Sequence, residues 1–184
     1  MPTQPASYEQ ELAPNEDAGP NQWEATGVPH WAEIDEPWAA PDRTNHIQTG
    51  GVPMSGKTER FGVTLPNKFN LEGGFDSITA FVYAAHSTES KNILLNFDLY
   101  IKGAWQGPQQ VTVTGGIANP GWYFGQWRVY NCDVNDADSI EFEIEVDPGP
   151  TYGSFDGVFV YTVCILIWGQ DILPTADAKL SQFM

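Results

Sequence analysis

One stretch of the chain alternates between acidic and apolar residues without a break. From Glu141 to Val146 the order is Glu, Phe, Glu, Ile, Glu, Val, and Ile140 precedes it in phase. Successive side chains of a β-strand point to opposite faces of its sheet, so the pattern predicts a strand with one face in a core and the other in water. The chain is therefore expected to contain a sheet that is buried on one side.

Five further stretches between residues 61 and 170 favour strands. Ile93, Leu95, Phe97, Leu99 and Ile101 form a second inward face, and β-branched and aromatic residues are frequent in residues 77–86, 109–114, 122–131 and 157–168. Turns rich in Gly, Pro and Asn separate these stretches, and none shows a convincing helical period. We predict an all-β protein with seven or eight short strands in an antiparallel β-sandwich.

Residues 1–60 have a different composition from the remainder. They contain five Ile, Leu, Val and Phe residues, against 33 in residues 61–170, together with eight of the 14 prolines. Such a segment cannot build a core of its own, and its prolines disfavour long helices and central strands. The composition predicts a long extended Pro- and acid-rich arm over residues 1–60, a β-sandwich domain over 61–170 and a short C-terminal tail over 171–184.

Three tryptophans punctuate this segment at intervals of eight and seven residues: Trp23, Trp31 and Trp38. Large aromatic side chains set among polar residues are frequent hot spots of protein interfaces. A short amphipathic turn over residues 30–38 would place Trp31, Ile34 and Trp38 on one face. The four side chains, Trp23 included, are candidate anchors on a partner subunit. The alternative, that they fold back onto the chain's own domain, is equally supported.

The last predicted strand, residues 157–168, is apolar on both faces. A central strand covered on both sides has this composition. The second cover would be the arm, a loop or another subunit, and the last option predicts a homo-oligomer such as a trimer.

Charge limits the partners. The chain has eight Lys and Arg residues and 24 Asp and Glu residues, which gives a net charge of −16. Nucleic acids and anionic membranes are themselves negatively charged and attract cationic surfaces. There is no apolar run of transmembrane length, and the first 20 residues lack the basic and apolar segments of a secretory signal. We therefore expect no nucleic-acid partner, no membrane partner and synthesis without an export signal.

A phosphate-loop pattern, G-x-x-x-x-G-K-T, runs from Gly51 to Thr58. A functional phosphate loop follows a strand and opens a helix. Neither element is predicted around this one, so the pattern is interpreted as a Gly-rich hinge between arm and sandwich.

Metal, cysteine and catalytic patterns are weak. Asp133, Asn135, Asp136 and Asp138 offer oxygen ligands at a spacing that matches calcium only in part. Cys132 and Cys164 are not in a Cys-x-x-Cys arrangement and are interpreted as small buried residues. The histidines have no paired metal spacing, and no hydrolase nucleophile motif is present. We expect no cofactor, no metal and no enzymatic activity.

Two tryptophans flank turns in the predicted sandwich, Trp105 and Trp122. Aromatic side chains on strands usually belong to a core, which is the interpretation of Trp127. Near turns they are better placed to stack on sugars, so Trp105 and Trp122 are the candidate glycan-stacking residues.

Four stretches of the sandwich together resemble a known domain family: those beginning at Asp76, Leu95, Trp127 and Gly157. Their order of a Trp-bearing strand, a D-x-N-x-x-D-S-I-type turn, a strand and a final hydrophobic strand is similar to jelly-roll β-sandwich domains in virion accessory proteins of tailed bacteriophages, of the decoration and fibre types. The resemblance covers residues 61–168. It implies a jelly roll in a virion component and supplies no catalytic residues.

The leading hypothesis from the sequence is a non-enzymatic structural protein of a tailed-phage virion. As a capsid decoration or cement protein, it would be made in the host cytoplasm and would clamp neighbouring capsid or other virion subunits with its N-terminal arm. The alternatives are a receptor- or glycan-binding virion appendage and a carbohydrate-binding module of a cellular protein.

Overall fold

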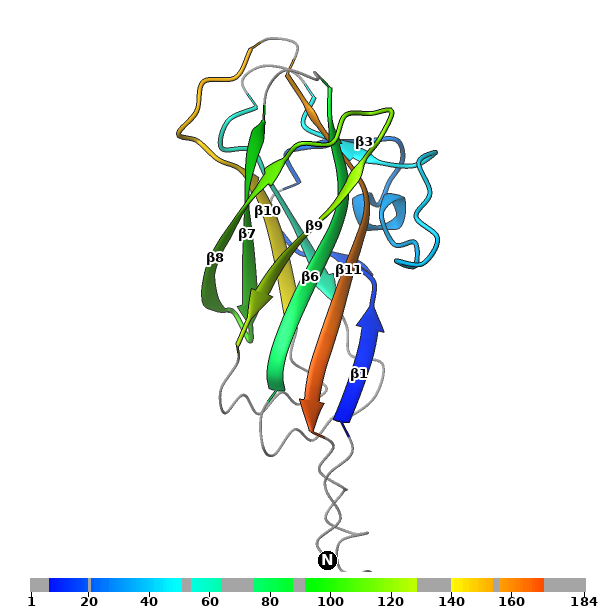
Figure 1. Ribbon diagram of the computed structural model, residues 1–184, viewed down its shortest axis with the longest axis vertical. Helices are drawn as coiled ribbons and strands as arrows, with labels where there is room; N and C mark the ends of the chain where they lie inside the picture. Colours follow the sequence, from blue (N-terminus) through cyan, green and yellow to red (C-terminus); the bar gives the residue numbers. More distant parts are fainter. Residues whose placement is uncertain are drawn as a thin grey trace, which may run out of the picture.

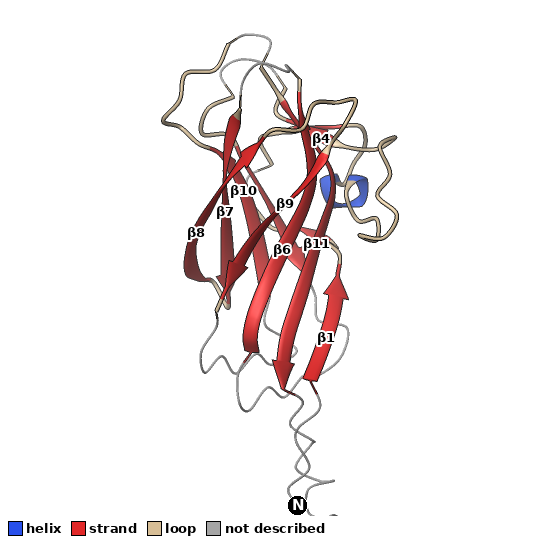
Figure 2. Cartoon of the chain, viewed as in Figure 1, coloured by secondary structure: helices blue, strands red, loops and turns tan. Residues whose placement is uncertain are grey.

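Two antiparallel sheets pack face to face in the computed structural model (Figures 1 and 2). The structure describes residues 7–19, 21–50, 54–63, 75–87, 92–128, 140–153 and 156–170. The predicted all-β sandwich is confirmed, and the only helical element in these ranges is the 3-10 turn η1 (His30–Glu33). No helix in the same ranges has the length and apolar character needed to cross a bilayer.

The first sheet has six strands. Its path runs β3-β4-β11-β6-β9, and β1 pairs with the same long strand, β11. The bounds are β1 (Ser7–Leu12), β3 (Glu24–Ala25), β4 (Ile47–Gln48), β6 (Phe75–His86), β9 (Gly121–Trp127) and β11 (Val158–Gln170).

The second sheet has five strands in the order β2-β5-β10-β7-β8. The bounds are β2 (Glu16–Asp17), β5 (Thr58–Val63), β7 (Ile93–Ile101), β8 (Ala104–Val113) and β10 (Ile140–Val146). The two alternating stretches that predicted strands most clearly, 93–101 and 140–146, have the bounds of β7 and β10.

The core lies between the sheets and follows the predicted alternation. Ile140, Phe142, Ile144 and Val146 of β10 are fully buried, as are Ile93, Leu95, Phe97 and Leu99 of β7. The rings of Phe97 and Phe142 meet edge to face with centroids 5.4 Å apart. Trp127 is buried against Phe142, as expected, and its Nε1 donates to the carbonyl of Gly107 at 2.7 Å.

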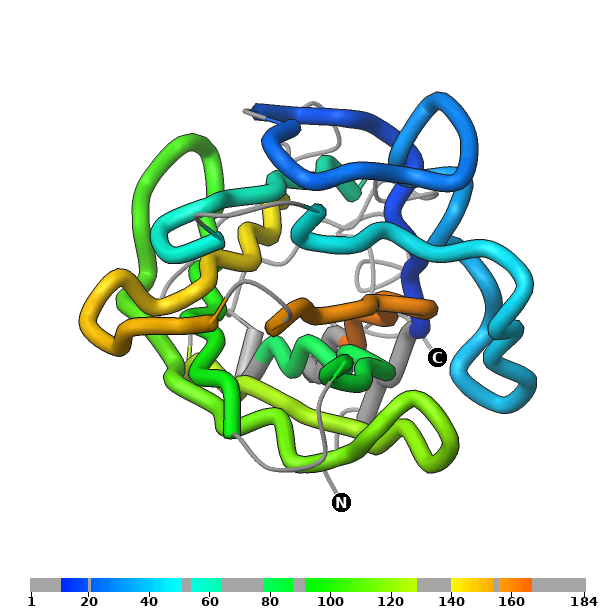
Figure 3. The backbone as a smooth tube through the Cα atoms, turned by 90° about the horizontal axis from the view of Figure 1, so that it is seen from above, coloured from blue at the N-terminus to red at the C-terminus, as the bar shows by residue number. Residues whose placement is uncertain are grey.

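The N-terminal segment is built into the sandwich, which corrects the expected extended arm over its described residues. Strands β1, β3 and β4 extend the first sheet and β2 pairs with β5 in the second. Viewed from above, the blue and cyan parts of the segment lie on the side of β11 that faces away from β6 and β9, while the light-blue loop after η1 extends along the edge of the sheet toward β6 (Figure 3). Edge strands and loops need few inward side chains because other strands supply the core, so a low apolar content does not require a free arm.

The N-terminal segment forms backbone hydrogen bonds with the edge of strand β11 at three places. Its edge pairs with β4 at Phe159 and Val160 and with β1 from Ile165 onward. Between these pairings, the N–H of Val163 donates to the carbonyl of Ile34 at 2.9 Å. The same segment also covers part of the outward face of β11, where the His46 ring contacts Phe159 and Tyr161, so it is one of the three predicted covers that the structure has.

Over its described residues, 54–58, the phosphate-loop pattern lacks the helix that a phosphate site requires. The strand β5 begins at Thr58, where a helix would be required. The Lys57 ammonium donates to the carbonyls of Thr49, at 3.1 Å, and of Gly50. The lysine therefore joins two backbone segments, while the first three residues of the pattern, 51–53, lie outside the described residues.

Candidate functional site

A continuous row of aromatic side chains crosses the outward face of the first sheet. We call this set the aromatic row. It comprises two residues from each of β6, β9 and β11 and two from the loop between η1 and β4: Phe81, Tyr83, Trp122, Phe124, Phe159, Tyr161, Trp38 and His46.

Strand alternation explains the row. On β6, Ala80 and Val82 point inward to the core, so Phe81 and Tyr83 point outward. The register of β6 against β9 places Phe81 opposite Phe124 and Tyr83 opposite Trp122. Cross-strand aromatic pairs of this kind stabilise a sheet and, on an outward face, also make a flat apolar surface.

Neighbouring rings are in contact along the whole row. The centroid distances are 6.0 Å for Phe124–Phe81, 5.6 Å for Phe81–Trp38, 5.8 Å for Trp38–Trp122 and 5.0 Å for Trp122–Tyr83. They continue with 6.0 Å for Tyr83–Tyr161, 5.9 Å for Tyr161–His46 and 5.4 Å for His46–Phe159. These are the separations of favourable tilted aromatic pairs.

The row is buried at Tyr83 and Tyr161 and open at Trp38 and Phe124. Trp38 is 45% exposed and Phe124 is 62% exposed, while Phe81 and Trp122 are half-buried between them. Large aromatic side chains grouped on an exposed face mark an interaction site more often than scattered ones do. This part of the row is the best candidate for a ligand surface among the described residues.

One cation lies beside the row. The exposed Arg43 donates from Nη2 to the Tyr83 hydroxyl at 3.2 Å and from Nη1 to the carbonyl of Ala118 at 3.3 Å. Burial raises the pKa of the Tyr161 hydroxyl, while the charge of Arg43 acts in the opposite direction. A guanidinium has five N–H donors, so Arg43 retains hydrogen-bonding capacity for a ligand with hydroxyl or carboxylate oxygens.

The two predicted glycan-stacking residues do not come together. Trp122 belongs to the aromatic row, whereas Trp105 lies on β8 of the other sheet, 57% exposed, with its Nε1 donating to Asp98 at 2.6 Å. Spacing along the sequence could not show that two turn-flanking tryptophans belong to different sheets.

Polar groups on the outward face of the second sheet are already joined to one another. The Arg60 guanidinium stacks on the Tyr100 ring, 4.0 Å from its centroid. Its nitrogens lie 2.9 Å from Glu143 and 3.3 Å from Glu141. A ligand on this face would have to displace these contacts, which makes it a weaker candidate than the aromatic row.

The four predicted partner anchors separate into two groups. Trp23 and Ile34 are buried in the chain's own core, which corrects their assignment as anchors for another subunit. Trp31 is half-buried against the same core, and only Trp38 is widely exposed. The amphipathic turn expected over residues 30–38 is η1, and it ends before Ile34.

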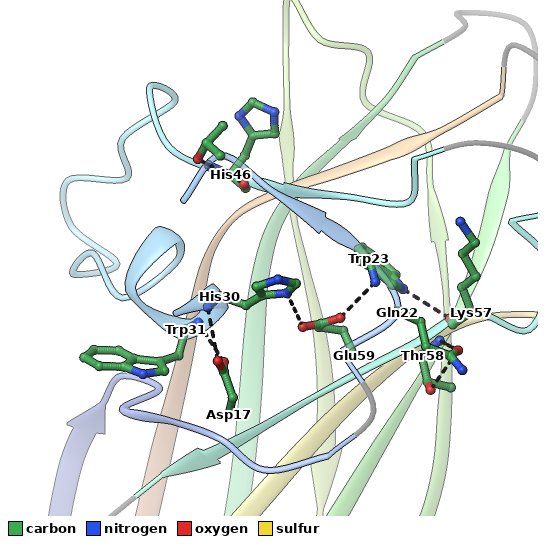
Figure 4. A network of polar contacts seen from close by, with 10 residues as sticks. Asp17, Gln22, Trp23, His30, Trp31, His46, Lys57, Thr58 and Glu59 are labelled. Atoms are coloured by element: carbon green, nitrogen blue, oxygen red, sulfur yellow. Dashed lines mark hydrogen bonds and ion pairs between the residues drawn. The ribbon is translucent and has the colours of Figure 1, made fainter. Parts of the chain in front are cut away.

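A polar network fastens Trp23 and η1 to β5 (Figure 4). The fully buried Glu59 accepts the N–H of Trp23 at 3.1 Å, and its other oxygen lies 2.7 Å from His30 Nδ1. Asp17 accepts the N–H groups of His30 and Trp31 at 3.2 and 3.0 Å. Burial raises the pKa of the Glu59 carboxyl, opposed by the Trp23 N–H and by His30. Because both carboxylate oxygens of Glu59 already have partners within the chain, we assign the Glu59–His30 pair a structural role.

Only some of the residues in the metal and cysteine predictions lie in the described part of the chain. The weak calcium candidates, residues 133, 135, 136 and 138, lie outside the described residues, as does Cys132. In the part of the chain that is described, no three His, Cys, Asp or Glu side chains group as metal ligands. Cys164 is buried, and burial together with Glu11 raises its thiol pKa to about 12.

Comparisons with known proteins find distant structural likeness and no matching family. No protein-family model and no curated protein sequence matches the chain. Among solved structures, it is similar to the CBM36-1 domain of a multidomain xylanase from the hindgut metagenome of Trinervitermes trinervoides, at 10% identity and a TM-score of 0.46, over 90% of this chain and 100% of that one.

Two further structures have a comparable likeness. One is a family 35 carbohydrate-binding module from Clostridium thermocellum, with 14% identity and a TM-score of 0.46 over 88% of this chain and 97% of that one. The other is the C-terminal CBM6 of LamC, a marine laminarinase from Zobellia galactanivorans, with 12% identity and a TM-score of 0.42 over 88% and 100%. At such identities and scores the likeness assigns no residue a role.

Proposed function

We propose that this chain is a non-catalytic carbohydrate-binding module that holds a glycan across the aromatic row. The observation that carries the proposal is the continuous run of rings over three strands, open to solvent at Trp38 and Phe124 and flanked by Arg43.

The chemistry of the row matches a sugar chain. A sugar ring has C–H groups on its faces and hydroxyls around its rim, so a flat aromatic surface binds its face while polar groups at the edge bind its rim. The rings of the row are in mutual contact, which fixes their positions before a ligand arrives and lowers the entropy lost on binding. A linear glycan of several units would contact more of the row than a monosaccharide.

The glycan hypothesis is better supported here than the capsid-clamp hypothesis. The clamp requires a free N-terminal arm with Trp23 and Ile34 available to a neighbour, and both side chains are buried in this chain's own core. The glycan hypothesis requires exposed aromatic side chains, which the first sheet provides. A glycan-binding virion appendage and a module of a cellular protein would both use the same row.

Binding to glycans in vitro tests the proposal. The full chain is run through native gels that contain xylan, mannan, laminarin, dextran or bacterial exopolysaccharide, and affinity for the best ligand is measured by calorimetry. Trp38→Ala and Phe124→Ala should each weaken binding at least tenfold, because each removes an exposed stacking ring.

Trp105→Ala is the matched control, because it removes a tryptophan that is more exposed than Trp38 and belongs to the opposite sheet. It should leave the affinity within twofold of the wild type. The proposal is refuted if the chain binds no glycan of a broad panel, or if Trp105→Ala abolishes binding while both row variants retain it.

A further inference from the structure

The outward side of β9 continues beyond the open end of the aromatic row. Trp127 is buried in the core, so its neighbours Gln126 and Arg128 point to the opposite side, which is the side of Phe124. Phe124, Gln126 and Arg128 are all exposed, and Arg128 directly follows the last residue of β9. The register places Gln126 opposite Thr79 of β6. An amide and then a guanidinium therefore follow the exposed aromatic rings along this strand.

The part of the chain that forms this edge of the sandwich carries no acid. Residues 99–132 contain neither Asp nor Glu, although the chain as a whole has 24 of them. This range comprises β8, β9 and the loop between them, and β8 and β9 are the end strands of their sheets. On β6, the outward side chains opposite β9 are those of Thr79, Phe81 and Tyr83, which are uncharged at neutral pH. An anion that approaches β9 therefore meets no carboxylate on β9 or on the part of β6 paired with it.

Two basic side chains lie on this face without a carboxylate partner. The described ranges hold five basic residues, of which Lys57 donates to backbone carbonyls, Arg60 pairs with glutamates, and Lys102 lies in the turn between β7 and β8 of the other sheet. The remaining two are Arg43 and Arg128, and among the described residues neither is within ion-pair distance of an Asp or Glu side chain. Their positive charge is therefore available to a ligand.

The two guanidinium groups lie toward opposite ends of the outward side of β9. Arg43 donates to the Tyr83 hydroxyl, and the register places Tyr83 opposite Trp122, near the start of β9. Arg128 follows the end of the same strand. At about 3.3 Å per residue, the positions of Trp122 and Arg128 are about 20 Å apart. The exposed ring of Phe124 lies between them, so a ligand that reaches both cations is a chain of several sugars rather than a single one.

The net charge of −16 opposes an anion less at this place than elsewhere. The glutamates that pair with Arg60 lie on the outward face of the other sheet. Packed sheets are about 10 Å apart, which exceeds the Debye length of about 8 Å at physiological ionic strength, so these charges are largely screened from β9. Two carboxylates closer to the row already accept backbone hydrogen bonds, Glu11 from Trp38 at 2.9 Å and Asp42 from Thr44 at 2.8 Å.

We infer that the glycan on the aromatic row is acidic and that its carboxylates pair with Arg43 and Arg128. The inference rests on the proposed glycan-binding function and deepens it by naming the substrate class, a polysaccharide that contains uronic acids. A guanidinium matches a carboxylate with two parallel hydrogen bonds. Arg43 uses two of its nitrogens within the chain and keeps further N–H donors for such a pair. Between the two cations, Phe124 stacks on the face of a sugar and the Gln126 amide binds hydroxyls at its rim.

The test compares charged and uncharged forms of the same polymers on the full chain. Polygalacturonate and alginate are the acidic probes, and the alkyl ester of each has the same backbone without the charge. At least one acidic polymer should bind in affinity gels and in calorimetry, and its ester should bind at least tenfold more weakly. Because the pairs are ionic, raising the salt concentration from about 50 to about 300 mM should also weaken binding at least threefold.

Arg43→Gln and Arg128→Gln should each weaken binding of the acidic polymer at least fivefold, because each removes one of the two cations. Lys102→Gln is the matched control, since it removes the same charge from the turn between β7 and β8 in the other sheet. It should leave the affinity within twofold of the wild type. Thermal unfolding shows whether each variant is folded, and Arg128→Gln decides the matter if Arg43→Gln is not.

Three results would each overturn the inference: neither acidic polymer binds, the esters bind as well as the acids, or Lys102→Gln weakens binding as much as Arg128→Gln does. In the third case the charge of the whole chain governs binding, and not the groups beside β9. Dextran sulfate, with dextran as its uncharged form, is a further probe. If dextran sulfate binds and neither uronate polymer does, the assignment to carboxylates is wrong.

The two proposals fail differently. If neutral polysaccharides bind and Trp38→Ala weakens them, while esterification and the arginine variants change nothing, the row is a glycan site and its ligand is not acidic. If an acidic polymer binds and depends on Arg43 and Arg128, but Trp38→Ala and Phe124→Ala bind as the wild type does, the carboxylate contacts stand and the proposed stacking on the row is wrong.

Discussion

Substitution of Ile34 by alanine tests whether the N-terminal segment belongs to the folded core. The Ile34 side chain is fully buried in the core, and its carbonyl accepts the N–H of Val163 in β11. Truncation of a buried isoleucine to alanine costs about 2–5 kcal/mol, through lost transfer free energy and the cavity left behind. We expect a loss of about 3 kcal/mol, since burial is complete and the surrounding strands limit collapse.

The assay is urea unfolding of the full chain, followed by tryptophan fluorescence, with thermal unfolding as a second measure. For a domain of this size, about 3 kcal/mol corresponds to a decrease in Tm of roughly 6–12 °C. The slope of free energy against urea should stay unchanged, because the same surface is exposed on unfolding.

Val28→Ala is the matched control from the same segment, because Val28 is 86% exposed. It should change stability by less than about 0.5 kcal/mol. A free arm would give equally small effects for both variants. A loss below about 0.5 kcal/mol for Ile34→Ala would therefore refute the placement of this segment in the core.

Two further predictions concern buried ionisable groups. Because burial raises the pKa of Glu59, the folded state holds its proton more tightly than the unfolded state, so the stability due to this proton is complete below pH 4.5 and is lost as the pH rises through the folded pKa. Glu59→Gln should therefore gain stability relative to the wild type as the pH rises from 4.5 to neutrality in urea titrations; a difference independent of pH would contradict this. With its pKa raised to about 12, Cys164 should react with a thiol reagent at pH 8 far more slowly in the folded protein than in urea, measured in a Cys132→Ser background. Equal rates would show that this thiol is accessible.

The alternation of apolar and polar residues predicted the sandwich well where one face of a strand lies in the core and the other face lies outward. Strand β10 is the clearest case, since its glutamates alternate with fully buried Ile and Phe. Strands β1 to β4 were not predicted, and three of them have only two residues, too few for any period to be visible. Their pairing is decided by partners distant in the sequence, such as Gln48 with Phe159.

The candidate site was predicted only in part for a related reason. Trp122 was selected because it flanks a turn, but Phe81 and Phe124 were not, although the register pairs them directly across β6 and β9. The alternation of Ala80, Phe81, Val82 and Tyr83 contains a usable signal, because the small and aliphatic residues occupy the inward face and leave the aromatic ones outward. To use this signal one must know which face of the strand is inward. The sequence of the strand alone does not show this when both of its faces are apolar.

The buried and exposed parts of the N-terminal segment depend on each other. Ile34 is fixed in the core at the register shift of β11, and four residues later Trp38 contacts Phe81 and Trp122 at the centre of the aromatic row. His46, near the end of the same loop, contacts Phe159 and Tyr161. The row is therefore made jointly by a sheet and by a loop that the core holds at Ile34 and Ile47. A ligand that stacks on Trp38 would bind the state in which Ile34 is buried in the core and not the state in which this segment is locally unfolded. Its binding would therefore stabilise the N-terminal segment against local unfolding.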